Sequence, residues 1–429
     1  MNFIVQPSTV VDATVTVPGD KSVSHRALML GGIAEGKSAI SGFLAGEDCL
    51  ATMAAMSAMG VDVQQSSPTD VVVNGVGLRG LVEPSQPLDL GNSGTAMRLM
   101  AGLLCGQSFS SVMIGDESLT SRPMRRVITP LTTMGADIES HDGCPPLRIQ
   151  GGKMLRGIDY TLPVASAQVK SAILLAGLYA DGITTVKEPA VTRDHTERML
   201  SAMGVEIDRV DRRISIRGDQ KLASTNIQVP ADLSSASFVM LAAILSRDAD
   251  VLIEGVGVNP TRTGVIDILQ AMGADISLQN ARLFGAEPVA DIRVRASRLE
   301  GGQVDPRLVS LAIDEFPVLF VAAATATGQT VFSGIGELRV KESDRIAAMA
   351  DGLRNLGIQV DETEDGATVH GGQFRGGEVQ SHGDHRVAMS LAVAATVADD
   401  SVTVHDVAAV NTSFPGFTEC LRQLGVDIQ

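Results

Sequence analysis

Apolar and polar residues recur with two different periods along this chain, which predicts a mixture of helices and strands. Apolar positions spaced three to four residues apart are typical of an amphipathic helix, as in 264–272. Alternation of apolar and polar residues is typical of a half-buried strand, as in 213–217 and 291–295. Two longer apolar stretches, 166–180 and 384–395, predict buried helices. The pattern therefore favours a fold in which helices and strands are interleaved.

A short phrase recurs six times: a methionine or leucine, a glycine and an apolar residue. Its glycines are 75, 69, 69, 84 and 68 residues apart, at Gly60, Gly135, Gly204, Gly273, Gly357 and Gly425. Each phrase ends a predicted helix with glycine at the position that favours left-handed backbone, and a strand follows. Because a unit of about 70 residues is small for an independent domain, we expect three units in each of two domains.

Composition places the chain among globular proteins with a large core. Of its 429 residues, 44% are hydrophobic and only 20% are charged. The formal net charge of -16 argues against nucleic acid or an anionic membrane as a partner, because both require a basic face. No apolar run approaches the roughly 18 residues that span a bilayer, and the N-terminus lacks a signal-peptide pattern. We therefore expect a soluble cytoplasmic protein that binds anions only through local cationic clusters.

The cysteines and histidines indicate neither disulfides nor a metal centre. The four cysteines lie far apart and form no C-x-x-C pair, so we expect reduced thiols. The seven histidines include no H-E-x-x-H motif, and His382 and His385 have no clear third ligand nearby. A G-x-S-x-G serine nucleophile is also missing. We expect a protein without a metal or cofactor.

Several predicted helices begin with residues suited to binding an anion. Free N–H groups and a partial positive charge at a helix N-terminus favour negative ligands. The stretch 19–26 places Lys21, Ser22 and Arg26 between a strand-like segment and an apolar run. Related patterns occur at 90–98, 166–171, 193–198 and 383–386. Ordinary capping and solvated charges explain any one of them alone, but their repetition favours an anion site.

Two charged clusters add to this picture. Three arginines occur within one predicted helical turn, at Arg122, Arg125 and Arg126, where a bound anion would relieve their repulsion. Lys341 and Arg345 lie four residues apart with Glu342 beside Lys341, which fits an ion-pair network or an acid–base group next to an anionic ligand. Asp314 precedes Pro317 at the start of an apolar helix, so we expect Asp314 to be its N-cap.

The stretch 31–38 matches the G-x-x-x-x-G-K-S nucleotide-binding loop, which makes a nucleotide-binding protein the rival hypothesis. That loop holds phosphate only when a strand precedes it and a helix follows it. Here the helix-like 26–30 comes first and the strand-like 39–43 comes after. We therefore interpret 31–38 as a turn from a helix to a strand.

Seven strings occur in order over almost the whole chain: GDKSVSHRALML, LGNSGTAMRLM, SRPMRRV, ASAQVKSAILLAGL, DEFPVLFVAAA, RVKESDRI and GDHRVAM. Together they resemble the 5-enolpyruvylshikimate-3-phosphate synthase family. The resemblance implies an α/β (α+β) protein, a two-domain inside-out barrel of the enolpyruvyl transferase fold with three βαβαββ repeats per domain. It implies one domain over 20–235 and a second over 1–19 plus 236–429, joined by two crossover segments.

The resemblance also implies a reaction. The enolpyruvyl group of phosphoenolpyruvate would pass to the 5-hydroxyl of shikimate 3-phosphate by addition and elimination, in chorismate and aromatic amino acid biosynthesis. Asp314 would take the hydroxyl proton, and Glu342 or Lys21 would handle the methylene proton. Shikimate 3-phosphate would be bound by Lys21, Ser22, Arg26, Ser166, Ala167, Gln168, Arg193, Asp314 and Lys341. Phosphoenolpyruvate would be bound by Lys21, Asn92, Gly94, Arg122, Gln168, Arg345 and Arg386.

Two alternatives share the implied fold. A UDP-N-acetylglucosamine enolpyruvyl transferase uses a loop cysteine ahead of the arginine that corresponds to Arg122, where this chain has Asp116 and Glu117. A protein that only binds ligands is disfavoured because the three implied catalytic residues are all present. The implied partners are the two small-molecule substrates, with glyphosate as a competitor of phosphoenolpyruvate because Gly94 leaves room for it. We expect a monomer.

Overall fold

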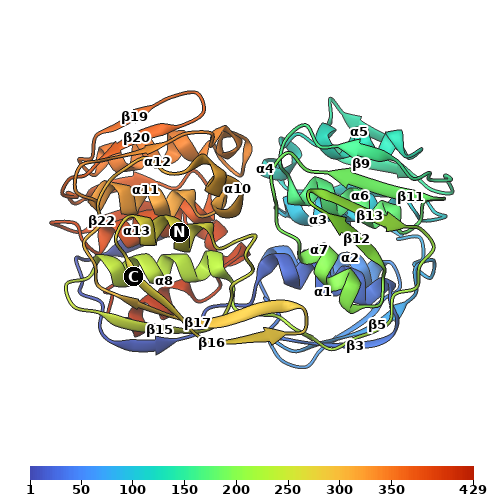
Figure 1. The fold of residues 1–429 in the computed structure, drawn as a ribbon, viewed down its shortest axis with the longest axis horizontal. Coiled ribbons are helices and arrows are strands. Elements are labelled where there is room, and N and C mark those ends of the chain that lie inside the picture. The colour runs from blue at the N-terminus through green and yellow to red at the C-terminus, as the bar shows by residue number, and fades with distance from the viewer. The chain divides into compact units, whose positions relative to one another are not determined.

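The computed structural model describes residues 1–429 and divides into two compact units, each with its own core (Figure 1). Unit 1 consists of Met1–Pro18, Pro230–Leu283 and Pro288–Gln429, and unit 2 consists of Gly19–Val229 and Phe284–Glu287. The chain therefore leaves unit 2 after Val229, six residues before the boundary expected at 235. The difference arises because helix α8 (Leu233–Leu245) is buried from its first residue in the core of unit 1.

Unit 2 contains three four-stranded sheets, and each belongs to one βαβαββ repeat. The strands of a repeat lie in the order first, second, fourth, third, as in the sheet β6-β7-β9-β8. The first repeat has α1 (Lys21–Ile33), β3 (Glu35–Ser41), α2 (Glu47–Ala58), β4 (Asp62–Gln65) and β5 (Val71–Val76). Its missing first strand is supplied by β14 (Ile227–Gln228), which pairs in parallel with β3.

The other two repeats of unit 2 are continuous in sequence. The second has β6 (Leu88–Asp89), α3 (Gly94–Leu104), β7 (Ser111–Ile114), the short α4 (Glu117–Thr120), α5 (Arg125–Thr133), β8 (Asp137–His141) and β9 (Cys144–Gln150). The third has β10 (Asp159–Thr161), α6 (Ala167–Gly177), β11 (Ile183–Lys187), α7 (His195–Ala202), β12 (Ile207–Val210) and β13 (Arg213–Arg217).

Unit 1 repeats the arrangement with two strands from the N-terminus. The first of its repeats has β2 (Ala13–Val15), α8, β15 (Asp250–Gly257), α9 (Gly264–Ala271), β16 (Asp275–Phe284) and β17 (Glu287–Arg295). The next has η1 (Pro306–Leu308), α10 (Val309–Ala312), α11 (Phe316–Thr325), β18 (Gln329–Phe332), η2 (Gly336–Val340), α12 (Arg345–Asn355), β19 (Val360–Glu362) and β20 (Ala367–His370). The last has β21 (Gly377–Gln380), α13 (His385–Ala395), β22 (Val402–His405), η3 (Ala408–Thr412), α14 (Phe417–Gln423) and β1 (Asn2–Val5), and β1 pairs antiparallel with β22.

The recurring glycines confirm the prediction of six repeats. All six have a positive φ, between 86° and 106°, and each lies two residues past a helix: α2, α5, α7, α9, α12 or α14. Left-handed backbone at this position lets the chain turn back after the helix, and glycine adopts it without the steric cost of a side chain. The sequence phrase therefore marks one structural position in every repeat.

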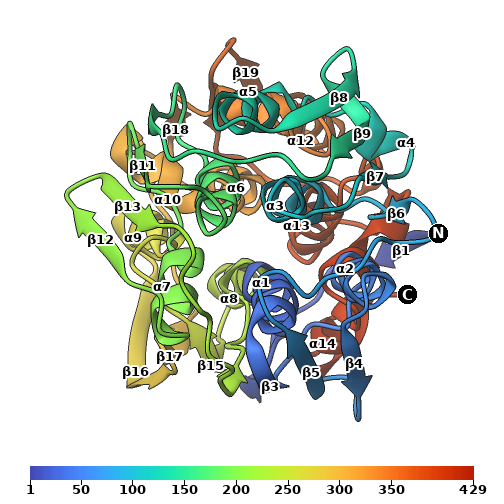
Figure 2. The same cartoon turned by 90° about the vertical axis from the view of Figure 1, so that its right-hand side faces the viewer.

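Three helices occupy the interior of each unit. Figure 2 looks along α1, α3 and α6, which lie among the sheets of unit 2. Their residues are almost all buried, as the apolar pattern of 166–180 predicted, although α6 ends at Gly177. In unit 1, α8, α11 and α13 pack against one another. No helix is long and apolar enough to cross a bilayer.

The stretch 31–38 forms a turn from a helix to a strand, as predicted. Helix α1 ends at Ile33 and β3 begins at Glu35, so the glycines and Lys37 do not ring the N-terminus of a helix. Ser38 is buried inside the unit. The arrangement that a nucleotide-binding loop requires is therefore not formed here.

Candidate functional site

Most of the predicted site residues of unit 2 lie at the N-termini of its three interior helices. Asp20, Ser93 and Ser166 cap α1, α3 and α6, and each side chain accepts a hydrogen bond from the backbone N–H three residues later, at 2.9, 3.1 and 3.3 Å. These caps begin the helices so that Lys21, Gly94 and Ala167 occupy their first positions. Backbone N–H groups in a first turn favour anions.

Arg26 is held in one orientation on α1. It is 3% exposed, and its Nε donates to Thr196 Oγ1 at 2.7 Å and its Nη2 to Ser171 Oγ at 2.9 Å. Its Nη1 donates to the carbonyl of Ser22 at 2.8 Å. Burial lowers the pKa of Arg26 to about 10, although the charge of Glu197 acts in the opposite direction. The guanidinium therefore remains a cation at neutral pH.

Gln168 on α6 is clamped by two residues of α3. Arg98 Nη1 donates to Gln168 Oε1 at 2.7 Å, and Gln168 Nε2 donates to Thr95 Oγ1 at 2.9 Å. The glycine at Gly94 leaves room for this arrangement, because a Cβ there would lie 2.7 Å from Arg98 Nη1 and 3.3 Å from Arg122 Nη1. The sequence pattern does not identify this contact of Arg98, although Arg98 lies one turn after Gly94 in the motif LGNSGTAMRLM.

Arg122 belongs to the loop before α5 and not to a helical turn, which corrects the prediction of three arginines in one turn. Pro123 follows it and α5 begins only at Arg125, while Arg125 and Arg126 are exposed. Arg122 turns inward and donates to Asn92 Oδ1 at 2.6 Å and to Asn92 O at 3.2 Å. The structure therefore brings Arg122 together with the loop that caps α3.

Lys21 and Arg193 add two cations to this part of unit 2. Lys21 Nζ lies 3.1 Å from Oδ2 of the buried Asp48, an acidic residue in the first turn of α2. The sequence does not identify Asp48 as a partner of Lys21, because an acidic residue in the first turn of a helix is explained equally well by the helix N-terminus. Arg193 precedes α7 by two residues, and its charge contributes to the lowered pKa of Arg26. The two arginines are therefore close enough to repel each other.

His25 is a buried neutral residue behind these cations. Its Nδ1 lies 2.7 Å from Thr52 Oγ1, and its Nε2 lies 3.4 Å from Ser93 Oγ. Burial lowers the pKa of His25 well below its ordinary 6.5, and the positive charges of Lys21 and Arg26 lower it further. Protonation of His25 would therefore destabilise the folded state relative to the unfolded state.

We predict that replacing His25 with glutamine flattens the acid side of the stability profile. In the wild type the unfolded chain binds a proton at His25 below pH 6.5 while the folded chain does not, so stability falls as pH falls, by about 1.4 kcal/mol per pH unit at most. Urea midpoints measured at pH 7.5 and pH 5.0 should therefore differ less for His25→Gln than for the wild type. The exposed His141 provides the control, since His141→Gln should keep the wild-type slope. Parallel profiles for His25→Gln and the wild type would contradict this account.

In unit 1, Asp314 lies among three cations. Its Oδ1 is 3.6 Å from Lys341 Nζ and 3.5 Å from Arg345 Nη1, and its Oδ2 is 4.0 Å from Arg386 Nη2. Arg386 Nη1 also donates to the backbone carbonyl of Asp314 at 3.0 Å. The structure thus brings together four predicted site residues from the starts of α11, α12 and α13 and from the segment before α12.

Arg345 is the buried centre of this cluster. It is 1% exposed, with Nη2 2.7 Å from Glu342 Oε2 and Nε 2.8 Å from Asp384 Oδ2. Burial acts to lower the pKa of Arg345, but the charges of Asp384, Glu342 and Asp314 outweigh it and raise the pKa above its ordinary value. Glu342 therefore forms an ion pair with the buried Arg345 beside Asp314. An ion-pair network is one of the two arrangements that the sequence spacing predicted.

The N-cap prediction for Asp314 is wrong. Helix α11 begins at Phe316 with Glu315 in the capping position, and Pro317 lies in the first turn as expected. The short α10 ends just before, so the backbone at Glu315 is already helical and no side chain caps the helix. Buried Glu315 accepts a hydrogen bond from Ser234 Oγ and lies 3.8 Å from Arg262 Nη2. Because the carboxylate of Asp314 does not cap α11, it is available to interact with Lys341, Arg345 and Arg386.

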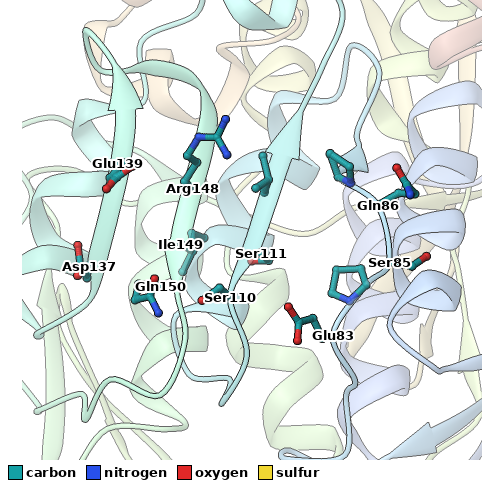
Figure 3. A pocket seen from close by; sticks show the side chains of 13 residues that line it. Glu83, Ser85, Gln86, Ser110, Ser111, Asp137, Glu139, Arg148, Ile149 and Gln150 are labelled. Atoms are coloured by element: carbon teal, nitrogen blue, oxygen red, sulfur yellow. The ribbon is translucent and has the colours of Figure 1, made fainter.

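Unit 2 also has a hollow on the sheet β6-β7-β9-β8 (Figure 3). It has a volume of about 420 Å³ and is lined by 83–87, 110–112 and residues of β8 and β9. Its charged lining residues are Glu83, Asp137, Glu139 and Arg148, and it contains no predicted site residue. The structure contains no group of three or more histidine, cysteine, aspartate or glutamate side chains placed to hold a metal ion.

Comparison with known proteins gives one consistent result. The family model described as EPSP synthase (3-phosphoshikimate 1-carboxyvinyltransferase) matches residues 5–421. The 3-phosphoshikimate 1-carboxyvinyltransferase of Methylococcus capsulatus is 56% identical over 428 residues, which cover 100% of this chain and 98% of that protein. That of Alkalilimnicola ehrlichii is 57% identical over 428 residues, with coverages of 99% and 96%. A solved EPSP synthase from Acinetobacter baumannii is 51% identical, with a TM-score of 0.89 and coverages of 100% and 99%.

Proposed function

The chain belongs to the EPSP synthase family, and from this we propose that its two clusters of motif residues provide the substrate-binding and catalytic groups of that family's reaction. The reaction transfers the enolpyruvyl group of phosphoenolpyruvate to the 5-hydroxyl of shikimate 3-phosphate and releases phosphate. The chain is thus a transferase of the shikimate pathway, in chorismate and aromatic amino acid biosynthesis. One observation supports the assignment of residues. The predicted site residues of unit 2 lie at or close to the N-termini of α1, α3, α6 and α7, and those of unit 1 surround Asp314.

We assign shikimate 3-phosphate to the α1, α6 and α7 side of unit 2, together with Asp314 and Lys341 of unit 1. The support is the pair of nearby cations, Arg26 and Arg193, and the free N–H groups at the start of α6. Positive charge and helix N-termini both favour the phosphate and carboxylate of this substrate. The residues of this set in unit 2 are Lys21, Ser22, Arg26, Ser166, Ala167, Gln168 and Arg193.

Phosphoenolpyruvate is assigned to three arginines and the loop before α3. Arg345 and Arg386 lie beside Asp314, and Arg122 is oriented by Asn92 next to Gly94. Arginine suits this role because its planar guanidinium can form two parallel hydrogen bonds with a carboxylate or phosphate. Lys21 and Gln168 would contact both substrates, as the resemblance implies.

The proposed mechanism is an addition followed by an elimination. Asp314 takes the proton of the 5-hydroxyl while the hydroxyl oxygen forms a bond to the central carbon of phosphoenolpyruvate. Lys341 lies beside that hydroxyl oxygen. Glu342 or Lys21 protonates the methylene carbon, which becomes a methyl group. The bond from the central carbon to the phosphate oxygen then breaks, and loss of one methyl proton restores the double bond. We further propose that the chain acts as a monomer in the cytoplasm.

An assay of phosphate release tests the function. Purified protein supplied with both substrates should release phosphate, and either substrate alone should give none.

Glyphosate should raise the apparent KM for phosphoenolpyruvate, because Gly94 carries no Cβ that would narrow the space beside Arg98 and Arg122. ATP hydrolysis abolished by Lys37→Ala would instead support the nucleotide-binding alternative. A glyphosate titration that shows no competition with phosphoenolpyruvate would refute only the prediction of inhibition.

A further inference from the structure

We propose that Ser171 and Thr196 are positioning residues that orient the guanidinium of Arg26 toward shikimate 3-phosphate without neutralising its charge. The inference rests on the proposed role of Arg26 in binding that substrate. Neither hydroxyl group belongs to the site residues that the family resemblance implies. They come from α6 and α7, whereas Arg26 comes from α1.

The three side chains form a closed triangle of hydrogen bonds. Arg26 Nε donates to Thr196 Oγ1 at 2.7 Å, and Arg26 Nη2 donates to Ser171 Oγ at 2.9 Å. Thr196 Oγ1 donates to Ser171 Oγ at 2.7 Å, so the two acceptors also hold each other. Ser171 and Thr196 are buried. Two separate nitrogens of one planar group are therefore fixed, which sets the plane of the guanidinium as well as its position.

Both hydroxyls are neutral acceptors, and nearby carboxylates bind another cation. Lys170, which is fully buried, lies 2.8 Å from Glu197 Oε1 and 3.1 Å from Glu188 Oε1. Glu197 is the residue next to Thr196, and its charge acts on Arg26 only as a weaker influence than burial. Lys170 thus pairs with Glu197 and Glu188. The charges of Asp20 and Glu287 also act on Arg26, but its direct hydrogen-bond partners are two hydroxyls and a backbone carbonyl, so its positive charge is available to an anionic ligand.

Arg345 in unit 1 shows the opposite arrangement. Its Nε and Nη2 are bound by the carboxylates of Asp384 and Glu342, and its pKa is raised. Arg26 has hydroxyls at its Nε and Nη2, and its pKa is lowered to about 10. The two buried arginines therefore differ in how much of their charge is compensated within the protein. A dianionic phosphate ligand gains most from an oriented cation that has no carboxylate of its own.

The test replaces one hydroxyl with a methyl group of the same shape. Thr196→Val should raise the KM for shikimate 3-phosphate about tenfold, because one hydrogen bond that orients Arg26 is lost. The KM for phosphoenolpyruvate should change less than about twofold. Thr196→Ser keeps the hydroxyl and should restore most of the affinity. Ser171→Ala should act in the same direction as Thr196→Val.

Thr184→Val is the matched control for burial. Thr184 is fully buried and its Oγ1 makes no hydrogen bond, so its replacement should leave both KM values unchanged. If Thr196→Val lowers the thermal midpoint but leaves the KM for shikimate 3-phosphate unchanged, Thr196 is merely structural and the inference is overturned.

Arg26→Lys separates this inference from the function on which it rests. A KM for shikimate 3-phosphate that is unchanged in Arg26→Lys would refute the proposed role of Arg26 itself. If Arg26→Lys raises this KM and Thr196→Val does not, the role of Arg26 stands and the positioning inference fails. In the expected case both single variants raise the KM, and Thr196→Val adds little to Arg26→Lys because the two changes act through the same group.

Discussion

Asparagine in place of Asp314 is expected to lower kcat by a factor of about 10² to 10⁴, the usual contribution of a positioned general base. The amide has nearly the shape of the carboxylate, but it cannot accept the proton of the 5-hydroxyl. Lys341, Arg345 and Arg386 would then lack the negative charge that lies 3.5 to 4.0 Å from each of them. Phosphate release at saturating concentrations of both substrates measures the effect.

The half-buried Asp305 is a matched control, because it pairs with Arg307 outside the cluster. Asp305→Asn should keep kcat within about twofold of the wild type. A higher KM for either substrate with unchanged kcat in Asp314→Asn would show that Asp314 binds substrate but is not the base. An unchanged rate with unchanged KM values would remove Asp314 from the mechanism altogether.

The largest effect on stability is expected from Lys170→Met. Lys170 is fully buried between Glu188 and Glu197, and its Nζ also donates to the carbonyl of Thr192 at 3.3 Å. Burial raises the pKa of Glu188, although the charge of Lys170 opposes that rise. Removing the lysine leaves two buried carboxylates without their cation, which costs about 3–5 kcal/mol. The thermal midpoint of unit 2 should fall on the order of 10 °C.

A surface ion pair shows the contrast within the same unit. Lys153 Nζ lies 2.9 Å from Asp137 Oδ2, a distance close to those in the buried cluster, but both side chains are at least 40% exposed. Lys153→Met should therefore change stability by about 0–1 kcal/mol. Adding Glu197→Gln to Lys170→Met should recover part of the loss, since one buried charge is removed. Equal midpoints for the two lysine variants would contradict the account of Lys170.

The repeats and the helix starts were readable from sequence because their signals are local. A glycine two residues past a helix and a capping side chain at its start act over a few residues, so Gly60 or Ser93 can be recognised in one short string. The contacts of Arg26 show the limit. Its partner Thr196 is 170 positions away, and no local pattern indicates that pairing.

Where local signals were ambiguous, neighbouring structure decided the outcome. Pro317 correctly predicted the first turn of α11, but it fits a helix that begins at several nearby positions. The preceding α10 made the backbone of Glu315 helical, and this moved the capping position past Asp314. For Arg122, the spacing to Arg125 suggested one helical turn, while Pro123 and the contact with Asn92 placed it in a loop.

The strands β1 and β2 also determine when unit 1 can be completed during synthesis on the ribosome. β1 and β2 are made before the rest of unit 1, yet the partner of β2, β15, begins only at Asp250, and β1 pairs with β22 at 402–405. At about 5–20 residues per second, β2 waits roughly 10 to 50 seconds for β15, during which the repeats of unit 2 are already available to fold. Both strands are therefore among the last parts of unit 1 to find their pairing partners, although they are made before the rest of it.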